Sequence, residues 1–185
     1  RRSRVFWGSF SLWRPRLIFW CGALAIGVVS VGFAKLADLA QHGFTSMTTA
    51  GEWNYLIPLL ITPAGFALSA YLAMRFLPNA QGSGIPQAIA ARHLKDEEDR
   101  GRLLSLRIAF GKILLTVFGL LCGASIGREG PTVQVGASIM LAAGRFGGMA
   151  QARGLILAGS AAGIAAAFNT PLAGIVFAIE EIDRK

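Results

Sequence analysis

Three long stretches of the chain contain no charged side chain. They cover residues 17–34, 53–74 and 154–179. A helix needs about 20 mainly apolar residues to cross the hydrocarbon core of a bilayer, and each stretch is close to that length or longer. A soluble core would rarely need three such runs. The pattern therefore predicts an all-α integral membrane protein with several spanning segments.

The first two stretches predict spanning helices over residues 17–40 and 53–78. Pro58 and Pro63 are expected to kink the second helix, because a proline inside a helix removes a backbone hydrogen bond. Further along, the apolar segments become shorter and rich in glycine, and cover about 103–126, 129–146, 150–167 and 170–182. Helices broken at membrane depth are tolerated where they line a watered cavity, with their N-termini facing an anion. This part of the chain therefore predicts tilted, broken helices around a central ion site.

Glycines spaced four residues apart let membrane helices approach each other closely. Pairs with this spacing include Gly119/Gly123, Gly123/Gly127 and Gly159/Gly163. Because glycine is common in this chain, the spacing alone is weak evidence for a particular helix contact.

The basic residues gather outside the apolar stretches. The chain has a net charge of +8, which in a soluble protein would favour a nucleic-acid partner. Here the arginines precede the first stretch and follow the second, and Lys35 is the only basic residue other than histidine between them. The excess of basic residues on cytoplasmic segments places the N-terminus and residues 75–107 in the cytoplasm. We expect a multi-pass protein of the cell (inner) membrane, with the lipid bilayer and no nucleic acid as partner.

Two segments outside the spans carry further predictions. Residues 4–16 interleave aromatic side chains with arginines, which is typical of a helix lying on the membrane surface. Residues 1–16 are therefore predicted to form a cytoplasmic interfacial helix, with a disordered basic tail as the alternative because Gly8 and Pro15 weaken the helix. Residues 92–102 carry charges of both signs and predict a solvated cytoplasmic loop.

The sequence shows no pattern typical of a metal site or an enzyme. Cys21 and Cys122 lie inside apolar stretches without CxxC or Cys/His spacing, which argues against a disulfide framework and a bound metal. The glycine-rich motifs contain no Gly-Lys-Ser/Thr, so they do not predict a phosphate loop. No nucleophile, base and orienting group occur together. We expect no enzymatic activity and no cofactor.

A first motif with possible anion chemistry is Gly82-Ser83-Gly84-Ile85-Pro86. It has the composition of a helix start, in which Ser83 can cap and Pro86 in the first turn forgoes a donor that would have no partner anyway. Glycines let backbone approach a ligand, and free amides at a helix start suit an anion. The alternative is an ordinary helix cap with no ligand.

A second motif, Gly127-Arg128-Glu129-Gly130-Pro131, repeats this composition with a carboxylate at the place of the anion. An acidic side chain at mid-bilayer costs about 2.5 to 3.5 kcal/mol, so an ionisable group there is first interpreted as an ion or proton site. Glu129 is thus predicted to mimic a bound anion and to alternate between charged and neutral forms. The alternative is a structural ion pair with Arg128.

Three more ionisable residues lie within or at the ends of apolar segments. Glu180 and Glu181 close the last segment, where they either belong to a site or mark the cytoplasmic interface. Lys112 either extends its ammonium group to the interface or adds positive potential along an anion path.

Three ordered motifs together resemble those of the CLC family of chloride channels and chloride/proton antiporters. They are the two motifs above, the second continuing through Thr132-Val133-Gln134, and Ala161-Ala162-Gly163-Ile164-Ala165-Ala166-Ala167-Phe168-Asn169-Thr170-Pro171-Leu172-Ala173-Gly174 through Glu180-Glu181. The resemblance covers nearly the whole chain and corresponds to the N-terminal half of a family member. It implies that residues 17–185 form the N-terminal half of an inverted-repeat transmembrane domain. The second-half motif Gly-x-Phe-x-Pro and the pore tyrosine of the family are absent from these residues, so the chain resembles a fragment.

The resemblance also implies roles for individual residues. Ser83, with Gly84 and Ile85, would bind the central chloride, and serine in this motif resembles chloride-preferring members rather than nitrate-preferring ones, which have proline. Glu129 would be the external gating glutamate that competes with chloride and takes up protons. Glu181 would match the internal proton-transfer glutamate of antiporters, a position at which channels generally lack an acid. Apart from the resemblance, we expect Arg128 and Lys112 to line the pore and to add positive potential along it.

The sequence thus supports chloride transport coupled to proton antiport as the first hypothesis, with chloride and protons as the transported ions and a homodimer as the full-length assembly. A passive voltage- or pH-gated chloride channel with the same pore is the second hypothesis. A third, from a different class, is a fragment or membrane scaffold that does not transport.

Overall fold

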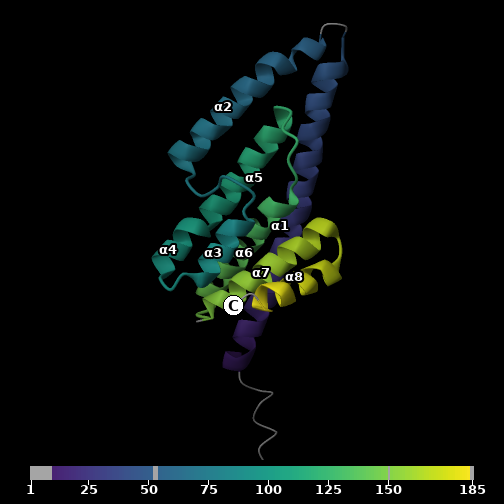
Figure 1. Ribbon diagram of the computed structural model, residues 1–185. Coiled ribbons are helices and arrows are strands. Elements are labelled where there is room, and N and C mark those ends of the chain that lie inside the picture. Colours follow the sequence, from purple (N-terminus) through teal and green to yellow (C-terminus); the bar gives the residue numbers. More distant parts are fainter. Residues whose placement is uncertain (1–9, 52–53, 150, 184–185) are drawn as a thin grey trace, which may run out of the picture.

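A computed structural model describes residues 10–51, 54–149 and 151–183 of the chain, except the side chains of residues 10–12, 55 and 181–183. All regular structure in this part is helical, as the sequence predicts (Figure 1). The helices are α1 (Phe10–Thr49), the short 3₁₀ helix η1 (Asn54–Leu56), α2 (Pro58–Phe76), α3 (Ile85–His93), α4 (Glu97–Leu103), α5 (Leu106–Leu121), α6 (Glu129–Phe146), α7 (Ala152–Phe168) and α8 (Pro171–Asp183).

Three segments are long and apolar enough to cross a membrane. They are Trp13–Thr49 in α1, Pro58–Phe76 in α2, and Glu97–Leu121, which joins α4 to α5. Large apolar side chains on these helices remain exposed, such as Leu24 at 72% and Leu60 at 78%. Water would disfavour that exposure and lipid would not. By contrast, α7 and α8 are apolar but shorter, in agreement with the predicted broken helices.

The first two helices differ in detail from the sequence prediction. α1 begins at Phe10 and runs through Pro15 and the first apolar stretch to Thr49 without a break, so residues 10–16 do not form a separate interfacial helix. The rest of the predicted interfacial segment, residues 1–9, lies outside the described residues. Pro58 does not kink α2 but starts it, at the position where a missing amide hydrogen costs nothing.

The mixed-charge segment is the clearest correction, because the predicted solvated loop over 92–102 contains α4. Acidic residues occupy the first turn of α4 and basic residues its last turn, which complements the helix dipole. Glu98 and Arg102 form an ion pair of 2.9 Å one turn apart. Arg100 is buried, and its Nε and Nη2 donate to the carbonyl of Leu94 at 3.0 and 2.6 Å.

α6 lies at the centre of the fold and contacts α1, α3, α5 and α7. It crosses α7 with backbone against backbone. A Cβ atom on Gly136 would collide with the carbonyl of Gly159, and a Cβ on Gly163 would lie 2.6 Å from the carbonyl of Thr132. Of the three glycine pairs named above, Gly159/Gly163 therefore lies at a helix crossing.

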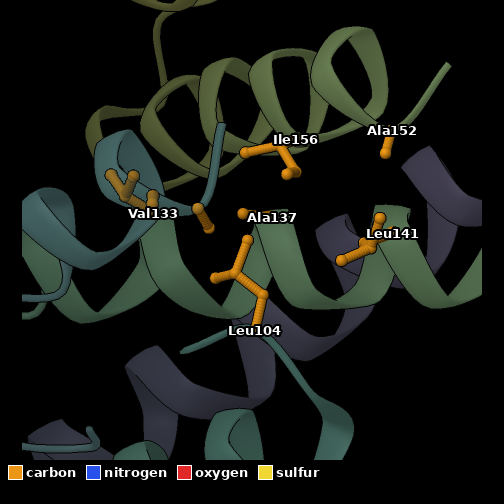
Figure 2. Packing of buried hydrophobic residues seen from close by; sticks show 8 residues of the cluster. Leu104, Val133, Ala137, Leu141, Ala152 and Ile156 are labelled. Carbon is orange, nitrogen blue, oxygen red and sulfur yellow. The ribbon is translucent and has the colours of Figure 1, made fainter. Parts of the chain in front are cut away.

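The main buried cluster joins α6 to the helices around it (Figure 2). Val133, Ala137 and Leu141 of α6 meet Ile156 and Ala152 of α7, with Leu104 beneath them. Ala88 and Ala91 of α3 complete the cluster. This packing fixes the start of α3 relative to the start of α6, and both of these helix ends belong to the motifs singled out in the sequence.

We predict that Gly159→Val lowers the stability of the folded protein by about 2 kcal/mol or more, because the added side chain meets backbone that cannot move aside. The measurements are the melting temperature in detergent and the elution profile in size-exclusion chromatography, in which the variant is expected to lose its monodisperse peak. Gly154→Val on the same helix is the matched control, since a Cβ at Gly154 meets nothing within 4 Å. Equal melting temperatures for the two variants would contradict the described crossing.

Candidate anion site

A cavity of about 640 Å³ lies between α2, α5 and the starts of α3 and α6. Its walls are mostly apolar or backbone, and it contains one acidic and one basic side chain, Glu129 and Lys112. The lining residues are Ser69, Ala70, Ala73, Ala80, Gln81, Gly82, Ser83, Ile85, Lys112, Leu115, Thr116, Ile126, Gly127, Glu129, Gly130 and Pro131. The two glycine-rich motifs of the sequence therefore meet at one cavity.

The first motif forms the start of α3, with one change from the sequence prediction. Gly84 occupies the N-cap position with a left-handed backbone (φ 98°), and Ser83 therefore does not cap the helix. The side chain of Ser83 is free for another role, and Ser83 and Ile85 line the cavity. Gly84 lies behind this wall, where a Cβ would come within 2.9 Å of Cβ of Gln134. The first amides of a helix lack partners inside the helix and favour negative charge.

The second motif forms the start of α6. Glu129 is the first residue of α6, and its carboxylate folds back over Gly127, where a Cβ would collide with Oε2. Gly130 touches the first motif, since a Cβ there would lie 2.7 Å from the carbonyl oxygen of Ser83. The predicted anion ligand Ser83 and the predicted anion mimic Glu129 thus line the same cavity.

Lys112 reaches from α5 to the loop that precedes the first motif. It is 1% exposed, so it does not extend to the interface as one of the two interpretations had it. Its Nζ donates to the carbonyls of Ala80 at 2.8 Å, Gln81 at 3.3 Å and Gly82 at 2.7 Å. Three carbonyls satisfy the three donors of an ammonium group without cancelling its charge. The positive charge therefore remains at the cavity wall.

Arg128 is placed differently from the two other charged residues of the site. It is not among the residues that line the cavity. Its Nη1 donates to Oδ1 of Asp38 at 3.0 Å and to the carbonyl of Ala34 at 3.3 Å, both on α1. The described partner of Arg128 is therefore Asp38, and not Glu129 as in the structural alternative.

Glu180 and Glu181 both belong to α8, and Glu180 is not among the described residues that line the cavity. α8 continues past both of them to Asp183. Glu180 is exposed. The backbone of Glu181 belongs to α8, but its side chain lies outside the described residues.

Gln134 also supports the site, although the sequence motif gave it no role. It is 0% exposed, and its Nε2 donates to the carbonyls of Asn79 at 3.1 Å and Leu103 at 3.0 Å. It thus ties α6 to the loop before α3 and to the end of α4. Thr132 holds the turn below Glu129, since its Oγ1 donates to the carbonyl of Arg128 at 2.6 Å. The signal in the sequence that could have indicated these two roles is the presence of polar residues on an otherwise apolar helix face.

Helix starts that face a cavity beside a buried cation form an arrangement that suits a bound anion. Residues 65–185 match the family described as voltage gated chloride channel, and this match covers more than half of the chain. The chain belongs to this family, which confirms the resemblance carried by the three motifs. The members of the family are membrane channels and transporters for chloride, and chloride transport is the general function of this domain.

We predict that Lys112→Met weakens chloride binding about tenfold, because the variant removes a positive charge from the cavity wall. The measurement is isothermal titration calorimetry with chloride on the full-length natural protein in detergent. Lys112→Arg retains the charge and is the matched control, expected to bind more tightly than Lys112→Met. Elution volume and melting temperature show whether each variant is folded. Unchanged chloride affinity in a folded Lys112→Met variant would contradict this role.

Proposed function

We propose that the protein exchanges chloride for protons across the cell (inner) membrane, with its N-terminus in the cytoplasm. The observation that carries the proposal is that Ser83 and Glu129 line one cavity at the starts of α3 and α6. Two helix starts offer unpaired amides to one anion, and the tethered carboxylate is chemically able to occupy the same place. Competition between a carboxylate and chloride is a direct way to couple the two ions.

In the proposed cycle, the charged carboxylate of Glu129 competes with chloride for the helix starts. Protonation removes its charge, so it no longer competes, and chloride enters beside Ser83 and Ile85. Lys112 contributes positive potential throughout, because its contacts are carbonyl oxygens rather than a carboxylate. Release of the proton to the other side returns the carboxylate to the site. Bound cofactors have no part in this cycle.

Glu181 has the second role in this proposal, as the residue that passes protons between the cytoplasm and Glu129. The support is the family membership of the chain together with an acid at the position where antiporters of the family have one. A homodimer is the proposed assembly of the full-length protein. Both statements extend the shown family membership, and the role of Glu181 is tested through coupling.

We predict that Glu129→Ala in the full-length natural protein retains chloride flux but loses proton pumping driven by a chloride gradient. Without the carboxylate, the anion site has no competitor and no proton carrier. The measurement uses liposomes, with a chloride electrode and a pH-sensitive dye inside the vesicles. Glu98→Ala is the matched control, since the side chain of Glu98 is 83% exposed on α4. Continued pumping by Glu129→Ala would refute the proposed function.

We predict that Glu181→Gln also uncouples protons from chloride, while Glu180→Gln on the same helix leaves coupling unchanged. The amide of the variant is unable to carry a proton but keeps the size of the side chain. The measurement is the reversal potential under a pH gradient, which moves with pH in a coupled exchanger and stays at the chloride equilibrium potential in a passive channel. A wild-type reversal potential that ignores pH would favour the channel hypothesis.

A further inference from the structure

An ion pair links the second motif to a helix far away in the sequence. Arg128 and Asp38 are 90 residues apart, and Arg128 Nη1 lies 3.0 Å from Asp38 Oδ1. The same nitrogen lies 3.3 Å from the carbonyl of Ala34, one turn earlier on α1. By contrast, the described ion pairs of Arg102 with Glu98 and Asp99 stay within α4. The Arg128 contact is therefore a connection between elements.

Arg128 is held at both ends, and the next residue is the proposed gate. Its carbonyl accepts from the amide of Thr132 at 3.1 Å and from Thr132 Oγ1 at 2.6 Å, which fixes the main chain to the first turn of α6. Its guanidinium is fixed to α1. Glu129 follows directly, with its carboxylate over Gly127. A residue fixed in this way restricts the directions in which the carboxylate of Glu129 leaves the backbone.

The pair is too accessible for its main effect to be on global stability. The side chains of Arg128 and Asp38 are 35% and 61% exposed, and exposed ion pairs contribute about 0 to 1 kcal/mol. The ion pair matters more for the local charge, because Asp38 compensates the positive charge of Arg128, the residue directly before Glu129. Among the described residues that line the cavity, Glu129 and Lys112 of α5 are the two charged groups. The residues of α2 at the cavity, Ser69, Ala70 and Ala73, are uncharged.

We propose that Asp38 is a positioning residue that keeps the guanidinium of Arg128 on α1 and away from the carboxylate of Glu129. Through this contact it sets the pH range over which chloride replaces the carboxylate. The proposal rests on the proposed function of Glu129. When Asp38 is replaced by a neutral residue, the guanidinium of Arg128 loses this partner and is able to pair with the charged carboxylate of Glu129. More acid is then needed to neutralise Glu129, and chloride transport starts at lower pH.

The experiment measures initial chloride efflux from liposomes as a function of pH, with the full-length natural protein. Asp38→Asn is expected to move the pH profile by about one unit toward acid, the size of effect that a cation within hydrogen-bonding range has on a carboxylate. Asp38→Glu retains the charge and is expected to restore the profile. Asp99→Asn is the matched control, because Asp99 is an acid of α4 whose side chain is 47% exposed and lies 3.6 Å from Arg102.

Variants that remove Glu129 separate this proposal from the proposed function. If Glu129→Ala is uncoupled but Asp38→Asn has the wild-type profile, the positioning role is refuted and the exchange function stands. If Glu129→Ala still pumps protons, the exchange function is refuted first. A shift that persists when Asp38→Asn is combined with Glu129→Ala would also refute the positioning role, since the shift would not act through Glu129. Asp38→Ser is the second variant if Asp38→Asn does not fold, with the same expected shift.

Discussion

The structure depends on the direct contact between the starts of two helices. Ser83 and Gly84 before α3 touch Gly130 in the first turn of α6, and a Cβ at Gly130 would lie 2.7 Å from the carbonyl of Ser83. Each helix start has backbone amides without a partner inside the helix and carries a partial positive charge. The contact is therefore electrostatically unfavourable until an anion or a carboxylate lies between the two helix ends. Glycine makes the approach sterically allowed. Together, these two facts define a place for negative charge that needs no cationic side chain in direct contact.

The two cationic side chains near the starts of α3 and α6 have opposite kinds of partner. Lys112 is surrounded by the carbonyls of residues 80–82, which satisfy its hydrogen bonds but leave its charge in place. Arg128 is paired with the carboxylate of Asp38, which cancels its charge. A cation in direct contact with the site would bind the anion too tightly, or would hold Glu129 in its charged state. In the proposed exchange, Lys112 supplies a modest positive potential, and the competition is between Glu129 and chloride.

The sequence predicted the parts of the site that depend on local composition. A cap-like motif places Ser83 and Glu129 at helix starts, and glycine-rich, interrupted segments predict broken helices; the helix bounds of the structure agree with both. The sequence pattern did not predict contacts between segments that are distant in the chain. Nothing in the pattern pairs Arg128 with Asp38 or Gln134 with Asn79, because those contacts depend on how α1 and α3 pack on α6. Mixed charge also concealed α4, since helix-compatible charge spacing and a solvated loop have the same composition.

The length of α1 gives the Arg128 contact a mechanical consequence. α1 has 40 residues, which is about 60 Å at 1.5 Å per residue and twice the thickness of the hydrocarbon core. Such a helix must tilt or extend beyond the bilayer. Near its start, Arg16 lies over the ring of Trp13 at 5.5 Å, a pairing suited to the membrane interface. Asp38 lies on the same helix, so its ion pair connects α1 to Arg128, the residue directly before Glu129.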